Sequence, residues 1–195
     1  MKNKKQTKSE KEVSKSGVIF EDGLVGLKTE EGEVILPSIF DDIYKISPDF
    51  PSKGDRLVVK QNGKWGVIEA DGKGAWIINP EYEYIGYPNR ITHVRKDDKW
   101  GVLDIEKDEY LIKPECDLIH DTDGFMFNNG IGVYEKNGRI GIVTEYGNFT
   151  DAIFEDLDGD PDGLVEVKFE GEWGFIDENN SFTVDEEEAY YSYEL

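Results

Sequence analysis

A chain of 195 residues with ten Phe, ten Tyr and four Trp has enough bulky apolar side chains to bury a core, which excludes a disordered protein. Its 43 acidic residues against 22 Lys and Arg give a formal net charge of -21. A surface this acidic repels phosphate backbones, so nucleic acid is not an expected partner. The sequence has no stretch near the roughly 20 apolar residues of a membrane span, no apolar signal region and one cysteine, so we expect no membrane association, no disulfide and a cytoplasmic location.

The charge is unevenly distributed along the chain. Residues 1–16 hold six Lys against two Glu, a net of +4, so the rest carries about -25, because -21 minus 4 is -25. The composition of residues 1–16 predicts a basic, disordered tail, solvated or strapped electrostatically onto an anionic surface. The body should attract basic partners with fast, salt-sensitive association.

A short pattern then occurs five times, and its shared glycine is residue 26, 66, 101, 141 and 174. An alternating apolar segment precedes each copy, at residues 18–20, 57–60, 91–95, 131–135 and 164–169. A turn of the Asn-Gly or Asp-Gly type follows, which requires positive φ and joins the two strands of a hairpin. The sequence therefore predicts five β-hairpins in tandem.

The returning strand of each hairpin carries the shared glycine, preceded in three copies by Trp65, Trp100 or Trp173. We interpret these three tryptophans as core rings, and Trp76, which lies outside this register, as either the more exposed aromatic or a further core ring. Glycine in a strand is unfavourable unless another backbone or a ring comes close. We therefore expect each shared glycine to make room for an indole or a neighbouring strand.

After a second turn, three copies have an apolar strand that runs into Pro37, Pro80 or Pro114. Proline cannot donate to a strand ladder, so it should mark a strand end or a bulge. A short closing segment of aromatic and acidic residues ends four of the copies, at residues 39–43, 82–85, 116–119 and 153–157. Each copy thus offers three or four short strands, and no segment has a helical period.

Two copies carry a more specific signature. Lys64-Trp65-Gly66-Val67-Ile68 and Lys99-Trp100-Gly101-Val102-Leu103, each followed by a turn and a proline-containing strand, resemble the WG (KWG) repeat family of bacterial proteins. The resemblance extends over residues 17–188, with copies one and four lacking the tryptophan and copy five the proline. It implies a β-rich repeat array with a binding or scaffolding role, and no shared catalytic residues.

The fold class that we predict is all-β, with five tandem repeats of three or four short antiparallel strands. Units this small cannot bury their apolar faces alone, so neighbours must pack together, in either a propeller-like or a stacked meander array. We expect a single domain over residues 17–195, with units at about 17–54, 55–89, 90–130, 131–163 and 164–195.

One segment has the spacing of a calcium loop. Asp158, Asp160, Asp162 and Glu166 follow a D-x-D-x-D-G-x-x-E pattern, in which alternate carboxylates can converge on a hard cation. Phe169 occupies the position where an EF-hand has its bidentate Glu, and no helix is expected on either side. The alternative is an acidic connector without metal, and we expect no other cofactor.

Catalytic chemistry has little support in the sequence. Cys116 and His120 are four residues apart, as a thiol and its base could be, but Cys116 aligns with Phe40, Tyr82 and Phe154 in the other repeats. We therefore interpret Cys116 as a small buried apolar residue. His93 and His120 have no partners at zinc-ligand spacing, and nucleotide-binding and hydrolase motifs are absent.

The leading hypothesis is a non-enzymatic protein-protein interaction module with an acidic binding surface. A narrower form is an immunity or inhibitor protein that neutralises a basic partner such as a toxin. The alternative is a calcium-stabilised array that binds a ligand or glycan, and an enzyme with a dispersed acidic site ranks third. The residues expected to form the binding rim are Asp41, Asp42, Trp76, Asp121, Asp123, Glu155, Asp156, Asp185, Glu186 and Glu187.

Overall fold

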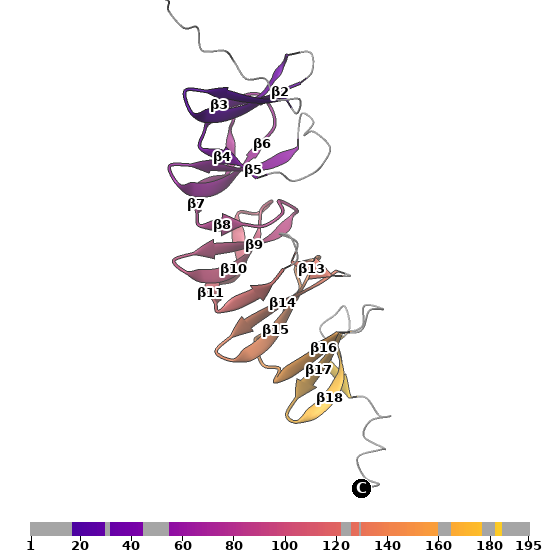
Figure 1. The fold of residues 1–195 in the computed structure, drawn as a ribbon. Helices are drawn as coiled ribbons and strands as arrows, with labels where there is room; N and C mark the ends of the chain where they lie inside the picture. Colours follow the sequence, from indigo (N-terminus) through magenta and orange to yellow (C-terminus); the bar gives the residue numbers. More distant parts are fainter. Residues whose placement is uncertain are drawn as a thin grey trace, which may run out of the picture. The chain divides into compact units, whose positions relative to one another are not determined.

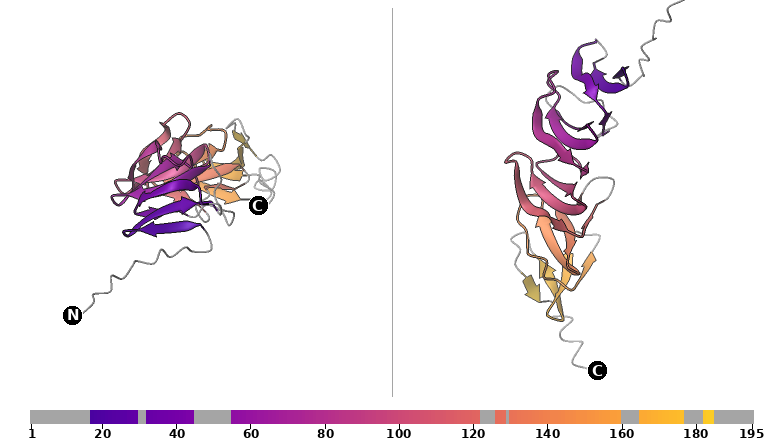
Figure 2. Two further views of the ribbon diagram at one scale, coloured as in Figure 1. Left: turned by 90° about the horizontal axis from the view of Figure 1, so that it is seen from above. Right: turned by 90° about the vertical axis from the view of Figure 1, so that its left-hand side faces the viewer.

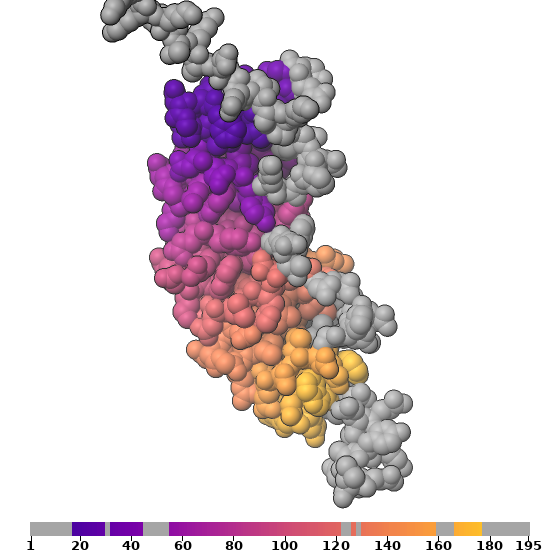
Figure 3. Space-filling model, viewed as in Figure 1, coloured from indigo at the N-terminus to yellow at the C-terminus, as the bar shows by residue number. Residues whose placement is uncertain are grey.

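The computed structural model describes residues 17–29, 32–44, 55–121, 126–128, 130–159, 165–176 and 182–184 (Figure 1). All regular elements within these ranges are β-strands, which confirms the predicted all-β class. The chain divides into two compact units, unit 1 (Met1–Glu81) and unit 2 (Tyr82–Leu195). Residues outside the described ranges are grey in Figure 3.

Unit 1 contains two antiparallel sheets (Figure 1). The first has the order β1-β2-β3, and its strands are β1 (Val18–Glu21), β2 (Leu24–Lys28) and β3 (Val34–Phe40). The second has the order β4-β5-β6-β7, with β4 (Asp42–Ile43), β5 (Arg56–Gln61), β6 (Lys64–Glu69) and β7 (Trp76–Tyr82), whose last residue is the first of unit 2.

Unit 2 contains three further sheets, seen from two more directions in Figure 2. The first has the order β8-β9-β10-β11, formed by β8 (Tyr84–Ile85), β9 (Ile91–Lys96), β10 (Lys99–Asp104) and β11 (Glu109–Cys116). In the next, β14 (Ile131–Lys136) pairs with β12 (Leu118–His120), β13 (Phe127–Asn128) and β15 (Arg139–Thr144). The last has the order β16-β17-β18-β19, formed by β16 (Asp156–Gly159), β17 (Val165–Phe169), β18 (Glu172–Ile176) and β19 (Phe182–Val184).

The five predicted hairpins are present and equivalent. Each shared glycine pairs with the residue seven positions earlier, as Gly26 does with Ile19 and Gly174 with Val167. Both central residues of all five turns have positive φ, 52–55° at the first and 61–88° at the second. These values define the type I′ turn, whose twist matches that of the strands. The turn residues are Asp22-Gly23, Asn62-Gly63, Asp97-Asp98, Asn137-Gly138 and Glu170-Gly171.

The shared glycine makes room for a bulge in the next strand. A Cβ on Gly101 would lie 2.8 Å from the carbonyl oxygen of Ile112 and 2.8 Å from the nitrogen of Pro114. The β10–β11 register shifts at this point, and β2–β3 shifts in the same way beside Gly26. The interpretation of the proline as a bulge marker is therefore confirmed at Pro114.

The boundaries of the sheets do not coincide with the boundaries of the sequence repeats. Each closing segment pairs with the first strand of the following hairpin: β4 with β5, β8 with β9, β12 with β14 and β16 with β17. In all four cases the acidic residue at the bend donates its N–H at 2.8 Å to the same carbonyl position of that strand. The donor and acceptor residues are Asp41 and Lys60, Glu83 and Arg95, Asp117 and Glu135, and Glu155 and Lys168. Each of these sheets therefore takes its outer strand from the preceding repeat.

Successive sheets within each unit pack on one another, as in a stacked meander. In unit 1, Leu36 and Phe40 of the first sheet form one buried cluster with Val59 and Ile68 of the second. In unit 2, one cluster joins the β8–β11 sheet to the β14 sheet, and another joins the β14 sheet to the β16–β19 sheet. These shared clusters provide the apolar burial that one small sheet lacks.

The closing-segment residue that aligns across the repeats is buried in every copy. Phe40 and Cys116 are fully buried, and Tyr82 and Phe154 are each 2% exposed. This confirms that Cys116 occupies an apolar core position. Burial raises the pKa of the Cys116 thiol to about 11, so it remains protonated near neutral pH.

The prediction that the register tryptophans are core rings is confirmed only in part: Trp100 packs against a buried cluster of unit 2. Trp65, Trp100 and Trp173 are half-buried instead of enclosed. The Lys60 ammonium lies 5.3 Å from the Trp65 ring, and Lys168 lies 5.9 Å from Trp173. Trp76 is also half-buried, which favours the core alternative: it packs on the unit 1 core, 5.6 Å edge-to-face from Phe40 and against Gly66.

The fourth repeat departs most from the pattern. After β15 only the isolated bridges Ile140–Phe154 and Val143–Phe149 replace a third strand. Thr150 supplies part of the missing ladder, since its Oγ1 accepts the Ile142 N–H at 3.0 Å and its N–H donates to the Ile142 carbonyl at 2.9 Å. Gly141 here faces the Tyr134 ring, so a ring occupies the space that a bulge fills elsewhere.

Candidate interaction surface

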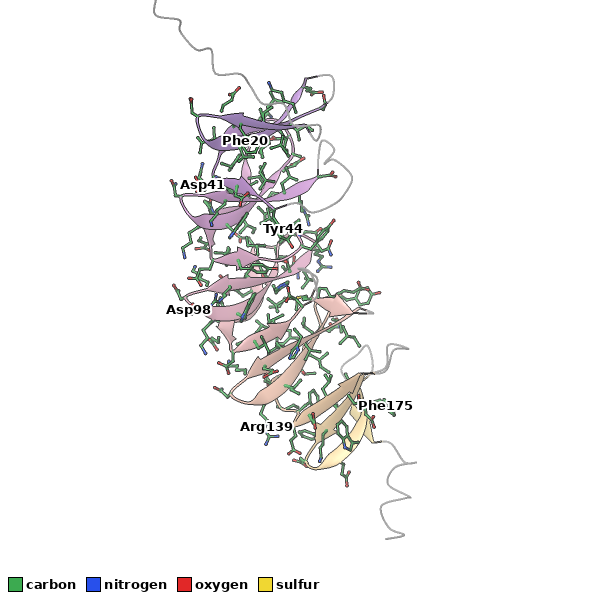
Figure 4. The ribbon with its side chains drawn as sticks, viewed as in Figure 1. Phe20, Asp41, Tyr44, Asp98, Arg139 and Phe175 are labelled. Atoms are coloured by element: carbon green, nitrogen blue, oxygen red, sulfur yellow. The ribbon has the colours of Figure 1, made fainter. Side chains whose placement is uncertain are left out.

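The strand ends of unit 2 form two edges with different chemistry. The hairpin edge contains the type I′ turns, and Asp98 and Arg139 lie at two of them (Figure 4). The loop edge is at the opposite ends of the same strands, where β10 ends at Asp104 and β15 at Thr144. Its exposed carboxylates are Glu106, Asp108, Glu109, Asp121, Glu145 and Asp158.

Several acids expected to bind a partner make local structural contacts in or next to the closing segments. In unit 1, Asp41 Oδ2 accepts the Gly63 N–H at 2.9 Å, and Asp42 Oδ1 accepts the Ile43 N–H at 2.8 Å. In unit 2, Glu155 lies 3.1 Å from Arg139, and Asp156 Oδ1 accepts the Leu157 N–H at 3.0 Å. Asp41 in particular holds a closing segment to the turn of the next hairpin.

Asp117 has the same role in unit 2, although the sequence did not single it out. Its Oδ2 accepts the Asn137 N–H at 2.8 Å, and its Oδ1 lies 2.6 Å from Lys99 Nζ. The hydrogen bond from Lys99 lowers the pKa of Asp117, helped by the amide of Asn137. Glu83 Oε2 likewise accepts the Asp98 N–H at 3.2 Å. The signal that could have identified this role is the acid that directly follows each buried residue of the closing segments.

Other ion pairs at the hairpin edge occupy most of its cations. Arg95 lies 2.7 Å from Asp98, and Lys136 lies 2.7 Å from Glu115, which lowers the pKa of Glu115. Together with the Lys99 and Arg139 pairs, these contacts balance much of the charge within the edge itself.

The loop edge is organised around one buried carboxylate. Asp104 is fully buried; its Oδ1 accepts the N–H groups of Glu106 and Lys107 at 3.1 and 3.3 Å, and its Oδ2 accepts two hydrogen bonds from Arg90. Lys107 Nζ lies 3.9 Å from the same Oδ2. Two exposed cations lie at this edge in the described part of unit 2. Both of them, Arg90 and Lys107, contact the Asp104 carboxylate.

The predicted rim is therefore divided between the two edges. Asp121 follows β12 and Asp158 lies in β16, both toward the loop edge, whereas Glu155 and Asp156 lie at the hairpin edge. Asp123, Asp185, Glu186 and Glu187 lie outside the described residues. The prediction that these acids bind a partner stays a prediction.

The calcium candidate is partly described. Asp158 stands directly opposite Glu166 in the β16–β17 ladder, which places two of the four predicted ligands side by side. Asp160 and Asp162 lie outside the described residues, and within the described ranges no three acidic, His or Cys side chains gather as a metal site. Calcium binding at this segment stays a prediction.

The Cys116 and His120 side chains have separate environments. Cys116 lies in a buried apolar cluster, whereas His120 is exposed and its Nε2 is 2.8 Å from Glu135 Oε1. The cysteine is also held as the neutral thiol by burial. This geometry does not make a thiol nucleophile with its base.

A cluster that the sequence analysis missed surrounds His93. This residue is 1% exposed, and its Nε2 lies 3.3 Å from Asp121 Oδ2, to which the Tyr84 hydroxyl donates at 3.4 Å. The Tyr84 and His93 rings both pack on Trp100, with centroids 5.4 and 5.7 Å away. Burial lowers the pKa of His93, opposed by the Asp121 charge. The available signal was a histidine at a repeat position where three other copies have valine.

These features define the class of protein. It is a tandem β-repeat protein in which acidic side chains of the closing segments accept hydrogen bonds from hairpin turns, and its loop edge carries exposed carboxylates. Residues 26–65 and 70–100 match the family model described as WG containing repeat. These two segments therefore match WG repeats, which confirms the resemblance seen in the sequence. No helix in the described part of the chain is long and apolar enough to cross a membrane.

No curated protein matches the chain. Among solved structures, Kluyveromyces lactis Hsv2 is 11% identical with a TM-score of 0.38, and the match covers 85% of this chain and 58% of that chain. Kluyveromyces lactis Hsv2 with complete loop 6CD is 10% identical with a TM-score of 0.39, covering 85% and 57%. The chain thus spans less than two thirds of these structures, and similarity at this level carries no information on function.

Proposed function

We propose that this chain is a non-enzymatic protein-interaction module whose loop edge binds a basic protein. The observation that carries the proposal is the charge balance of that edge in unit 2: six exposed carboxylates, with Arg90 and Lys107 both drawn onto Asp104. Arg90 also lies 3.8 Å from Glu106, so acids outnumber cations at this edge and a cationic partner would gain attraction there while Arg90 and Lys107 stay on Asp104.

The hairpin edge supports the proposal by contrast. Most of its Lys and Arg side chains already contact carboxylates, and Glu83 and Asp117 accept turn N–H groups. Binding a partner through these groups would require breaking contacts that hold one repeat to the next. The loop edge can be occupied at a smaller structural cost.

The narrower form of the proposal is an inhibitor or immunity protein. Its support is the formal net charge of -21, which would steer the chain toward the cationic substrate groove of a toxin such as a nuclease. The cytoplasm is the location that this role requires.

The test uses an oligolysine peptide as the probe and the full chain as the receptor. Binding measured by fluorescence anisotropy should weaken by about tenfold between about 20 mM and about 200 mM salt. A variant with Asp108→Asn, Glu109→Gln, Glu145→Gln and Asp158→Asn should lose most of the low-salt affinity.

The control removes four charges from the hairpin edge through Asp97→Asn, Asp156→Asn, Glu170→Gln and Glu172→Gln. It should keep most of the affinity, because net charge changes equally while the loop edge is intact. Equal losses in the two variants, or binding that does not respond to salt, would reject the loop edge as the binding surface.

The second candidate function is a calcium-stabilised ligand-binding or glycan-binding array. The observation that favours it is the cross-strand placement of Asp158 and Glu166, which brings two of the four predicted calcium ligands to adjacent positions. Calcium should then raise the melting temperature of the wild-type chain, and Asp160→Ala should abolish the rise. An unchanged melting temperature at saturating calcium eliminates this candidate.

A further inference from the structure

The loop edge carries one large aromatic side chain that faces solvent. Tyr146, two residues after the end of β15, is 68% exposed, more than any other large apolar side chain in the described part of the chain. The repeat pattern does not require an aromatic residue there. Five residues after the shared glycine, three other copies have an acid, namely Glu31, Asp71 and Glu106. Single exposed apolar residues are common on proteins, so exposure alone does not make Tyr146 a binding residue.

The described acids at the equivalent position contact their own surroundings, whereas Tyr146 does not. Asp71 Oδ1 accepts the N–H groups of the turn residues two and three positions later, at 2.8 and 3.2 Å. Glu106 lies 3.8 Å from Arg90. The Tyr146 side chain makes no hydrogen bond and no ring contact within the described residues. Tyr146 thus replaces a residue with local contacts by one that has none.

Backbone contacts fix the turn that carries Tyr146. The Gly147 N–H donates to the Thr144 carbonyl at 2.9 Å, which closes the turn. The Glu145 N–H donates to the Gly130 carbonyl at 2.9 Å and so ties the turn to the chain just before β14. An aromatic side chain on a fixed backbone has few torsions left to immobilise, so it binds a partner at a low cost in conformational entropy.

Elsewhere this chain covers aromatic rings with its own ammonium groups. A cation over a ring face is attracted by the negative face of the ring. The Lys Nζ lies 5.3–5.9 Å from the ring centroid in three pairs, Lys60–Trp65, Lys96–Tyr82 and Lys168–Trp173. No Lys or Arg of the described residues covers Tyr146 in this way. The ring face of Tyr146 is therefore available to a cation from outside the described chain.

The charges near Tyr146 favour a cationic ligand. Residues 140–167 contain no Lys or Arg. Arg90, an exposed cation of the loop edge, is already held at 3.2 Å by Asp104. Glu145, next to Tyr146, is exposed and makes no ion pair within the described residues. An aromatic ring beside unpaired carboxylates attracts a cation through both the ring face and the charges, and it repels an anion.

We infer that Tyr146 is the specific contact residue of the loop edge and that its ring receives a Lys or Arg side chain of the partner. The inference rests on the proposed binding of a basic protein, and it states where one cation of that protein lies. The ammonium or guanidinium group stacks on the ring face, with the Glu145 carboxylate beside it. A partner with Lys or Arg at this point is preferred over one whose positive charge lies elsewhere.

The experiment compares variants of the full chain for binding of the oligolysine peptide at low salt, by fluorescence anisotropy. Tyr146→Phe keeps the ring and should keep the affinity. Tyr146→Leu keeps an apolar side chain without a ring face and should weaken binding by about threefold. Circular dichroism and the urea midpoint report that each variant is folded, as the exposure of Tyr146 leads us to expect.

A second pair of variants sets the ring against the charge. Tyr146→Glu introduces the residue found at positions 31 and 106, so it adds a negative charge while it removes the ring. It should still weaken binding of oligolysine by about twofold. The matched control is Leu118→Asp at the hairpin edge, where a 41% exposed apolar residue gives way to the residue found at positions 42 and 156. This control adds the same charge and should not weaken binding.

Proton NMR of the bound peptide detects the ring contact directly. The ε-methylene protons of a Lys that stacks on a tyrosine ring move upfield, because the ring current shields them. Part of this shift should be present with the wild type and with Tyr146→Phe, and absent with Tyr146→Leu. The shift does not depend on how strongly the other carboxylates attract the peptide.

The results separate this inference from the proposed function. Unchanged binding by Tyr146→Leu, or tighter binding by Tyr146→Glu, would overturn the inference and leave the loop edge as a purely electrostatic surface. Equal losses in the two four-charge variants would instead reject the loop edge as that surface, whatever Tyr146 does. Self-association of the chain that Tyr146→Leu abolishes would identify a second copy as the occupant of the ring, and would also overturn the inference.

Discussion

The hairpin edge and the loop edge of unit 2 contain similar residue types in different surroundings. At the hairpin edge, Asp117 and Glu155 contact Lys99 and Arg139. At the loop edge, Asp104 contacts both nearby cations, Asp121 bonds to His93, and the exposed acids outnumber the cations. The difference shows that a count of acids does not locate a binding surface. A binding surface is located instead by the position of the acids relative to turn amides and to paired cations.

The largest expected effect comes from the buried centre of the loop edge. Asp104→Ala leaves the Arg90 guanidinium and the Glu106 and Lys107 amides without their shared acceptor, and should lower the free energy of unfolding by about 3 kcal/mol. Urea denaturation measures this. Glu106→Ala, at the exposed partner of Arg90, is the matched control, and equal losses would contradict the central role of Asp104.

Acidification should weaken the protein through His93, which bonds to the loop-edge residue Asp121. Burial lowers the folded-state pKa of His93, so the unfolded chain takes up this proton first. The His93 contribution to stability is thus complete above the unfolded pKa of about 6.5 and is lost as pH falls toward the lowered folded value. The urea midpoint should fall more steeply between pH of about 7 and about 5 in the wild type than in His93→Gln. Parallel pH profiles would show that His93 titrates alike in both states.

At the hairpin edge, Asp117→Asn should cause a smaller loss than Asp104→Ala. The Lys99 contact and the Asn137 amide lower the folded-state pKa of Asp117, so its stabilisation is present above the unfolded pKa of about 3.9 and is lost as pH falls through the folded value. The variant should therefore be less stable than the wild type near neutral pH and approach it in acid. Urea midpoints at the two pH values provide the measurement. A difference that persists in acid would assign the effect to packing.

The smallest effects should have opposite signs at the two edges. Glu145→Gln removes one of several like charges at the loop edge and should stabilise the chain by less than about 0.5 kcal/mol at low salt. Lys99→Gln leaves Asp117 without its cation at the hairpin edge and should destabilise it by a comparably small amount. Thermal unfolding at low and high salt measures both, and changes of the same sign would remove the distinction between the edges.

Local features of the fold could be predicted from the sequence because they depend on nearby residues. Positive φ at Asn62-Gly63, the bulge at Pro114 and the burial of Cys116 each follow from turn chemistry, a missing N–H or repeat alignment. The pairing of each closing segment with the next hairpin could not be predicted. The shortest of these strands have two residues, and an apolar pattern that short does not specify which neighbour it joins.

The candidate site was less predictable for a related reason. Asp41 and Asp121 look alike in sequence, but one accepts a turn amide and the other lies beside a buried histidine. Trp65, Trp100 and Trp173 were assigned to the core because they occupy one repeat position, whereas Lys60 and Lys168 cover two of them from the surface. In both cases the deciding contacts come from residues distant in sequence.

The borrowed outer strand affects how the array can change length. A duplication or deletion that runs from one closing segment to the next inserts or removes a hairpin together with a matching donor, so every remaining sheet stays complete. A duplication or deletion that begins at a hairpin boundary instead leaves one sheet without its outer strand and one closing segment without a sheet to join. Because neighbouring repeats share strands in this way, unfolding of one repeat removes the outer strand of the next sheet. We therefore expect the repeats within a unit to unfold together.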